Sequence, residues 1–493
     1  MELLLLVIVI VIVLLPTLLL FYLSNPKSEG PLMAYPLIGS LPQFINHRHR
    51  LQEWQTELLA AAPTNTLHIR LLGMQQGIVT ANPADLEHVL ESNFQNGNYP
   101  KGPYVTSVME DFLGQGIFNA DGELWKRQRR TASSEFSTRS LRIFIVESVQ
   151  RKVTRRLLPL LRRAAASGAA VDLQDVLEWF AFDNVCQVAF NEDPACLATE
   201  GEDSAGGGRL PPGFAAAFRD ATAITACRFR YAVPWMWKVK KLLNVGSEKR
   251  LRESISTLND FARSVIRSRK EKLRSPAAAA AEELRHQDLL SRFIAGEDNS
   301  DEFLRDIVVN FILVGQETTS SALTWFFWVL SERSDVERKI LRRSKECFGF
   351  DKLREMTYLH AAVTEAMRLY PPVPWNSSYC LADDVLPDGT KVWFMAAVWG
   401  EDFGEFRPER WLGPGGEFRA ESPFRFPAFH GGARSCLGKE MAYLQMKSMA
   451  ACLIERFTLD VVGGGGRPEM LLSTSLRVKG GLLVRVRERT TPR

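Results

Sequence analysis

The 493-residue sequence lacks the residue patterns that mark several large classes of protein. It has seven cysteines, an odd number, and no two of them form a C-x-x-C pair, so neither a disulfide framework nor a zinc site is expected. Long basic stretches with interleaved aromatic residues are absent and the net charge is only +4, so nucleic-acid binding is not expected. No G-x-G-x-x-G motif follows a strand-like run, so no nicotinamide site is predicted. Most of the cysteines are expected to be buried small hydrophobic residues in a reducing compartment.

One long apolar run is present, at the N-terminus. Residues 3–23, LLLLVIVIVIVLLPTLLLFYL, carry no charge, and as a helix they would be roughly 30 Å long, about the hydrocarbon thickness of a bilayer. No small-residue cleavage site accompanies the run, so residues 1–24 are predicted to be a membrane anchor, with a buried core helix as the alternative. The first positive charge, Lys27, follows the run, which predicts that the rest of the chain is cytosolic.

The remaining pattern predicts one large helix-rich domain. Four prolines between residues 25 and 44 predict a stiff hinge, followed by a catalytic domain over 45–493. Two strand-like runs precede a helix start near Asn82, helical periodicity dominates 123–347, and the C-terminal SLRVKGGLLVRVRER alternates like a strand pair. The predicted fold class is therefore mainly α with small β-sheets at the two ends of the sequence.

The stretch FHGGARSCLGKE places Cys436 directly before a helix-like run. A thiolate is the metal-ligating form of cysteine, and a helix N-terminus lowers a thiol pKa. The neighbouring glycines allow the backbone to approach something flat or bulky, and Arg434 can meet an anion beside the ligand. These properties suit an iron porphyrin with a thiolate on one face and a propionate near the arginine. The alternative is an inert core cysteine.

The motif F-x-x-G-x-R-x-C-x-G, formed by Phe429, Gly432, Arg434, Cys436 and Gly438, resembles the haem-binding loop of cytochrome P-450 monooxygenases. The resemblance implies the cytochrome P-450 fold and haem b (iron protoporphyrin IX) as cofactor. It also implies that Cys436 ligates the iron and that Phe429, Gly432 and Arg434 bind the cofactor.

Two further motifs resemble elements of the same family. Trp125 and Arg129 match W-x-x-x-R, whose side chains hydrogen-bond a haem propionate. Glu365 and Arg368 match a structural E-x-x-R pair, and Arg410 is its expected third member, supporting the cysteine loop from behind.

Residues 312–330, ILVGQETTSSALTWFFWVL, are apolar on nearly all helical faces, so they predict a buried helix. Burying Glu317 and Thr318 inside it is costly without partners. One explanation is a helix kinked by threonines that bond to their own backbone. The resemblance gives another: Glu317 and Thr318 would be catalytic and relay protons to dioxygen. Val314 stands where the family prefers alanine or glycine.

A basic face, Lys126, Arg127 and Arg130, follows Trp125. It is either an ordinary solvated surface or a docking site for an acidic electron donor. The resemblance implies that electrons come from a separate, membrane-bound NADPH cytochrome P-450 reductase. It also implies location at the endoplasmic reticulum membrane with the catalytic domain in the cytosol.

Residues 173–190, 319–336 and 438–457 resemble plant fatty-acid ω-hydroxylases, whose relatives oxidise jasmonoyl-isoleucine. We therefore expect O2-dependent hydroxylation of the terminal region of a fatty acid, an apolar carboxylate, with the hormone conjugate as an alternative substrate. A haem-thiolate isomerase or dehydratase of lipid peroxides and an inactive homologue are alternatives of another class. By resemblance, the segments expected to line the substrate pocket are 112–117, 373–376 and 476–478.

The sequence departs from the family at residues 391–399, KVWFMAAVW, where members have a longer segment that supplies sheet strands and a short helix. A trimmed sheet leaves backbone groups unpaired, at about 1–3 kcal/mol each if they are buried. This predicts low stability or poor haem retention.

Overall fold

The computed structural model describes most of the chain from residue 39 onward. The described residues are 16–17, 31–32, 39–48, 50–69, 77–94, 97–137, 140, 144–198, 210–231, 235–274, 288–296, 299–343, 349–382, 384, 386, 402, 404–463 and 466–489. Nearly all of the predicted anchor, most of the hinge and the shortened segment 391–399 lie outside these residues. Among the helices of the described ranges, none is both long and apolar enough to cross a bilayer.

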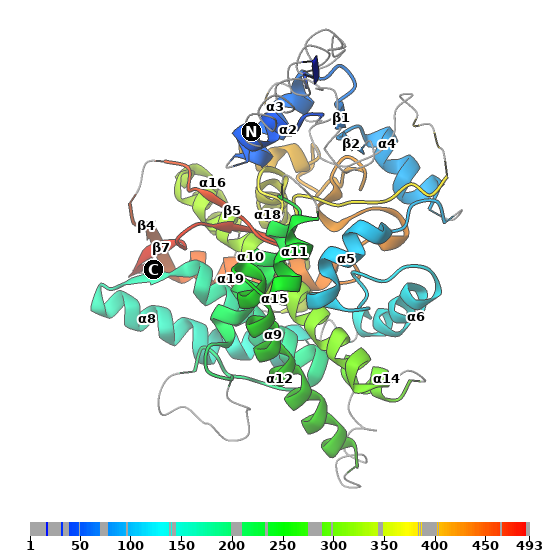
Figure 1. Cartoon of the computed structure of the whole chain (residues 1–493). Helices are drawn as coiled ribbons and strands as arrows, with labels where there is room; N and C mark the ends of the chain where they lie inside the picture. The colour runs from blue at the N-terminus through cyan, green and yellow to red at the C-terminus, as the bar shows by residue number, and fades with distance from the viewer. Residues whose placement is uncertain are drawn as a thin grey trace, which may run out of the picture.

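The prediction of a mainly helical fold is confirmed (Figure 1). The α-helices are α2 (Leu41–His47), α3 (Leu51–Ala61), α4 (Pro83–Glu87), α5 (Gly102–Leu113), α6 (Gly122–Ser133), α8 (Leu158–Ser167), α9 (Leu173–Phe190), α10 (Phe214–Arg228), α11 (Met236–Leu243), α12 (Ser247–Arg274), α14 (Leu289–Ile294), α15 (Asp301–Ser331), α16 (Ser334–Arg343), α17 (Phe350–Glu355), α18 (Thr357–Leu369) and α19 (Lys439–Arg456). Shorter helical turns are η1 (His88–Ser92), η2 (Ser134–Phe136), η3 (Phe144–Gln150), η4 (Val153–Leu157), η5 (Pro408–Trp411), η6 (Pro427–Phe429) and η7 (Gly432–Arg434).

Small antiparallel sheets complete the described fold. Their strands are β1 (Thr66–Ile69), β2 (Gly77–Thr80), β3 (Ala170–Asp172), β4 (Phe457–Val461), β5 (Met470–Leu472), β6 (Leu476–Val478) and β7 (Leu483–Glu488). The pairings are β1-β2, β3-β7-β4 and β5-β6. The predicted N-terminal strands and the following cap are confirmed, since the Asn82 side chain accepts a hydrogen bond from the Ala84 amide at the start of α4.

The expected pairing of the two C-terminal strands is wrong. Both β6 and β7 form, but β6 pairs with β5 and β7 lies between β3 and β4. Gly480 and Gly481 both have positive φ angles, which turn the chain from one sheet to the other. A side chain at Gly481 would also overlap the carboxylate of Asp172, which receives the Leu482 amide.

Helix α15 occupies the centre of the fold and contacts α9, α12, α18, α19 and β6. Figure 1 shows α9, α10, α15 and α19 in the middle of the molecule, with α2, α3, β1 and β2 at one end. Two large hydrophobic clusters share α9 and α15, with Phe180 and Phe326 in one and Phe182 and Phe311 in the other. Gly315 lets α9 approach closely, because a Cβ there would overlap Val185. The predicted buried helix is therefore confirmed.

In the described part of the chain the cysteines form no disulfide with one another. Cys186 and Cys452 are buried, as expected, but Cys227 and Cys380 are exposed. The expectation that most cysteines are buried is therefore wrong.

Candidate active site

Cys436 lies in a tight loop that runs from η6 through η7 to the start of α19. Its backbone amide donates to the carbonyl of Phe429 at 2.8 Å, which closes the loop. Gly432 has a φ of +61°, and a Cβ there would overlap the Leu90 carbonyl of η1. Only glycine fits this position, because a side chain would meet both the unfavourable backbone angle and a fixed backbone atom.

The Cys436 thiol is surrounded by protein on most sides, and this burial raises its pKa. A hydrogen bond from the Gly438 amide and the charges of Arg129 and Lys439 act in the opposite direction. The amide at the helix entrance thus lowers this pKa, as expected, but desolvation of the thiolate outweighs the favourable contacts, so the net shift in the protein chain alone is upward. The thiolate needs a further positive group, such as a metal ion, to be favoured.

Arg434 and Trp125 come together on one side of the loop. The guanidinium of Arg434 lies 4.6 Å from the centre of the Trp125 ring and donates to the carbonyl of Ala120 at 3.1 and 3.2 Å. It also pairs with Asp121. Arg129 is near enough to Arg434 for its positive charge to lower the pKa of Arg434, after the larger effect of burial.

Two further basic residues, Lys101 and His430, join this group, and sequence reasoning missed both. Lys101 Nζ donates to Asn376 Oδ1 at 3.0 Å. Burial and then the charge of Arg434 lower the pKa of Lys101 to about 8, against the opposing effect of Asp121. Burial and then the charge of Lys101 lower the pKa of His430 to about 4, so its ring is neutral at physiological pH. Neither residue belongs to a motif that marks it in the sequence.

The donor set around Cys436 fits haem b. In the described part of the chain the Asp121 carboxylate pairs with Arg434 and acts on the charge of Lys101, and Arg129 adds a third positive charge near Arg434. Buried charges of one sign are unfavourable unless a partner compensates them. A flat macrocycle with two carboxylates supplies that compensation, and a cysteine thiolate suits its iron.

A second ionic cluster lies behind the loop. Glu365 accepts from Arg368 at 2.8 and 2.9 Å, from the Arg407 amide at 2.9 Å and from Trp411 Nε1 at 2.8 Å. Arg410 lies 3.5 Å from the same carboxylate. The geometry thus brings the expected Glu365, Arg368 and Arg410 together.

Aromatic contacts join that cluster to the cysteine loop. The Trp411 ring lies 4.9 Å from Phe426, which precedes η6. Tyr443 of α19 shares a 2.9 Å hydrogen bond with Thr364 and lies 5.1 Å from the Phe429 ring. The cluster therefore supports the loop through packed side chains.

Glu317 and Thr318 lie on α15, but their side chains make different contacts. Thr318 Oγ1 donates to the Val314 carbonyl at 2.7 Å, the backbone bond that the sequence suggested. The Glu317 carboxylate is buried and accepts from Thr474 at 2.9 Å and from Ser475 at 2.6 Å. Arg477 lies 3.8 Å from it. The hydroxyls come from a segment more than 150 residues away in sequence, so no local pattern indicated them.

The segments expected to line the substrate pocket are only partly brought together. Phe112 packs in the cluster that contains α15 residues, and Ile117 packs on Trp125. Leu476 and Val478 pack on Trp325 of α15. In segment 373–376, Val373 is exposed, and Trp375 packs against the hydrophobic cluster that contains Leu51 and Trp54 of α3 and no residue of the other two segments.

The basic face is on the outside of α6. Lys126, Arg127 and Arg130 are all exposed, and Lys126 forms a 2.7 Å ion pair with Glu123. This placement suits both a solvated face and a docking surface.

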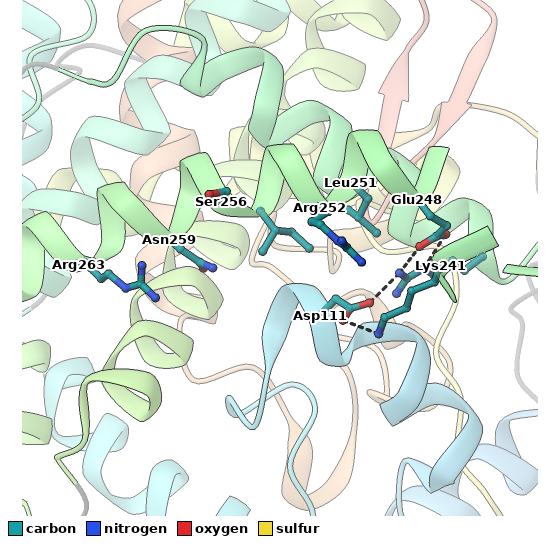
Figure 2. Close-up of a pocket in the computed structure, with 10 residues that line it drawn as sticks. Asp111, Lys241, Glu248, Leu251, Arg252, Ser256, Asn259 and Arg263 are labelled. Atoms are coloured by element: carbon teal, nitrogen blue, oxygen red, sulfur yellow. Dashed lines mark hydrogen bonds and ion pairs between the residues drawn. The ribbon is translucent and has the colours of Figure 1, made fainter. Parts of the chain in front are cut away.

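A separate surface cavity of about 310 Å³ lies along α12 and contains no residue of the cysteine loop. Figure 2 shows Asp111 of α5 reaching toward Lys241, with Glu248 above them. Arg228, which is buried, donates to Asp111 at 2.7 Å and to Glu248 at 2.5 Å and lies 4.3 Å over Trp237. Because these charges compensate one another, the cluster joins α5, α10 and α12.

The fold and the cysteine loop define a class, the haem-dependent oxidoreductases that hold iron through a thiolate. A family model described as Cytochrome P450 matches residues 29–484, and the chain belongs to this family of monooxygenases. It is 47% identical to Cytochrome P450 CYP94D108 of Paris polyphylla, over 92% of this chain and 91% of that protein. It is 43% identical to Cytochrome P450 94B1 of Arabidopsis thaliana, over 94% and 92% of the two chains, and 40% identical to Cytochrome P450 94A1 of Vicia sativa, over 92% and 90%. Family membership entails haem b, O2, a redox partner and a hydrophobic substrate.

Proposed function

We propose that this protein hydroxylates the ω region of fatty acids, using O2 and electrons from NADPH cytochrome P-450 reductase. Three stretches, residues 173–190, 319–336 and 438–457, resemble plant fatty-acid ω-hydroxylases and support this substrate class. Jasmonoyl-isoleucine, also an apolar carboxylate, is the alternative substrate.

In this proposal Cys436 ligates the haem iron. Arg434, Arg129 and Trp125 hold a propionate, with the Arg434 guanidinium already seated over the indole ring. Phe429 and Gly432 shape the loop that presents the thiolate. Once bound, haem supplies the activation of O2 and the insertion of one oxygen atom into a C–H bond.

One observation carries the choice of monooxygenation, namely a buried acid beside a threonine on α15. The second oxygen atom of O2 leaves as water, so each turnover consumes protons, which a buried carboxyl and a hydroxyl can deliver. In this proposal Glu317 and Thr318, neighbours on α15, deliver those protons. Rearrangement of a lipid peroxide consumes no protons, so this pair favours the monooxygenase over the isomerase.

We further propose a cytosolic catalytic domain over 45–493, anchored at the endoplasmic reticulum membrane by residues 1–24 and held by the hinge 25–44. The surface of α11 supports contact with a membrane: Leu242 is 85% exposed and Leu243 63% exposed, close to Lys238 and Lys240. Exposed apolar and basic side chains together suit a lipid interface. Lys126, Arg127 and Arg130 are the proposed docking surface for the acidic reductase.

The experiment uses the full chain in microsomes with NADPH cytochrome P-450 reductase. The reduced protein with carbon monoxide should show the strongly red-shifted Soret band of thiolate-ligated haem, and Cys436→Ala should abolish this band and turnover. Cys227→Ser, at an exposed cysteine, is the control and should retain both.

Mass spectrometry of products from graded fatty acids and from jasmonoyl-isoleucine then identifies the substrate. Products oxidised near the chain terminus support the proposal. NADPH-independent conversion of lipid peroxides would support the isomerase, and absence of the Soret band would support the inactive homologue.

A further inference from the structure

Glu317 is the inner end of a row of alternating charges that crosses four elements. Arg477 of β6 lies 3.8 Å from Glu317 and 2.5 Å from Glu178 of α9. Arg219 of α10 lies 3.5 Å from the other oxygen of Glu178 and 2.6 Å from Asp175. The row therefore links a buried acid on α15 to the surface of α9 and α10.

Solvent exposure rises along this row. The side chains of Glu317, Glu178 and Arg477 are 3%, 6% and 11% exposed, whereas those of Arg219 and Asp175 are each 38% exposed. The inner three groups are thus shielded from bulk water, and the outer two meet it.

Strand β6 holds Arg477 between the two inner acids. Gln174 of α9 accepts from the Val478 amide at 2.9 Å and donates to its carbonyl at 3.2 Å. On the other side, Ser321 and Trp325 of α15 donate to the Leu476 carbonyl at 2.6 and 3.1 Å. With both neighbours fixed, the side chain of Arg477 has little freedom to leave the acids.

The inner cluster has two carboxyl groups and one guanidinium, so it carries a surplus negative charge unless one carboxyl is protonated. Burial raises the pKa of Glu178 to about 7; Arg477 and Arg219 lower it, and Glu317 and Asp175 raise it. Among the described residues, these four charged groups, from β6, α15, α10 and α9, have the largest effects on this pKa. Near neutral pH the carboxyl of Glu178 therefore carries an exchangeable proton, and Glu178 contacts the same arginine, Arg477, as Glu317 does.

We propose that Glu178 and Arg477 position the carboxyl of Glu317 and that Glu178 is the group through which Glu317 regains protons from solvent. This inference rests on the proposed role of Glu317 in turnover. Each proton passes from bulk water to Glu178, from Glu178 through an intervening water to Glu317, and then toward Thr318; the carboxylate of Glu178 is refilled from bulk water, so no net charge accumulates. Arg477 stays cationic, since guanidinium is not deprotonated in proteins, and it compensates whichever carboxylate has lost its proton.

The test compares Glu178→Gln with wild type and with Glu248→Gln, a buried glutamate ion-paired to Arg228 and unconnected to Glu317. Infrared difference spectra of the resting full-length protein from about pH 6 to about pH 8.5 should show one protonated carboxyl band that titrates near neutrality. That band should be absent in Glu178→Gln and retained in Glu248→Gln. A wild-type protein without such a band overturns the proposal.

Product formed per NADPH consumed is the second measurement. In wild type this ratio should fall with rising pH. In Glu178→Gln the ratio should be independent of pH and roughly threefold to tenfold lower, because one charge-assisted contact is lost. A purely structural Glu178 would leave the shape of the profile unchanged. If no fatty acid is oxidised, the infrared band still decides this inference. Oxidation with no such band retains the proposed function and rejects the inference.

Glu317→Gln covers the case in which Glu178→Gln does not fold. Because the charge of Glu317 raises the pKa of Glu178, removing that charge should move the midpoint of the infrared band to lower pH. An unchanged midpoint overturns the proposal.

Discussion

Two ionic clusters flank the cysteine loop. In one of them the protein compensates all the buried charge, and in the other positive charge is left over. Behind the loop, Glu365 accepts hydrogen bonds from Arg368, Trp411 and the Arg407 amide. On the Trp125 side, Asp121 compensates Arg434 and Lys101, and Arg129 adds a positive charge that no described carboxylate pairs with.

The difference separates support from ligand binding. A buried carboxylate that is fully hydrogen-bonded rigidifies its surroundings and requires nothing further. A surplus of buried positive charge is unfavourable until an anion arrives, so it marks a site built for a ligand. Breaking the first cluster should therefore damage folding, whereas changing the second should mainly affect haem.

The largest effect is expected from Glu365→Ala. Removing this carboxylate leaves Arg368, whose side chain is 4% exposed, without its buried partner. Loss of one member of such a pair costs about 3–5 kcal/mol. Urea unfolding should show this loss in free energy even before haem is added. Glu455→Ala, at an exposed glutamate, is the control, and an equal stability of both variants would remove Glu365 from the supporting role.

The cluster on the Trp125 side should instead make the stability of the protein depend on pH. The folded-state pKa of Lys101, about 8, lies below its ordinary value of 10.5, so the unfolded chain binds more protons between these values. The unfolding free energy of the haem-free protein should therefore rise with pH through this window, by at most about 3–4 kcal/mol. Lys101→Met should flatten the rise. Bound haem should also reduce it, because an anion favours the charged lysine; a rise that persists with haem bound would contradict this pairing.

Residue spacing predicts a contact in these clusters only where the two residues lie close together along the chain. Glu365 and Arg368 are three residues apart on α18, so helical spacing alone brought them together. Lys101 and Asn376 are 275 residues apart, and no local pattern indicates their contact. The helix α15, the cysteine loop and the N-terminal strands were likewise predictable, because each rests on local periodicity or turn chemistry. Strand partners were not, since Asp172 and two glycines redirect the chain between β6 and β7.

A smaller effect is expected from Arg129→Met. No hydrogen bond or ion pair of this guanidinium occurs among the described residues, and its charge disfavours that of Arg434. The variant should therefore fold as stably as wild type. Haem should dissociate about tenfold faster, since one charge-assisted contact to a propionate is lost. Transfer of haem to apomyoglobin measures this rate, with Arg130→Met on the exposed face as the control; a stability loss without faster transfer would contradict the ligand role.

The smallest effect is expected from Trp411→Phe, which removes one of several donors to Glu365 and keeps an aromatic ring against Phe426. Glu365 retains Arg368 and the Arg407 amide, so the loss should be only about 1 kcal/mol. Urea unfolding of Trp411→Phe in wild-type and Glu365→Gln backgrounds separates this hydrogen bond from packing. A loss that is the same in both backgrounds would mean that Trp411 acts through its ring alone. A smaller loss in the glutamine background would show that the indole N–H helps to complete the cluster behind the loop.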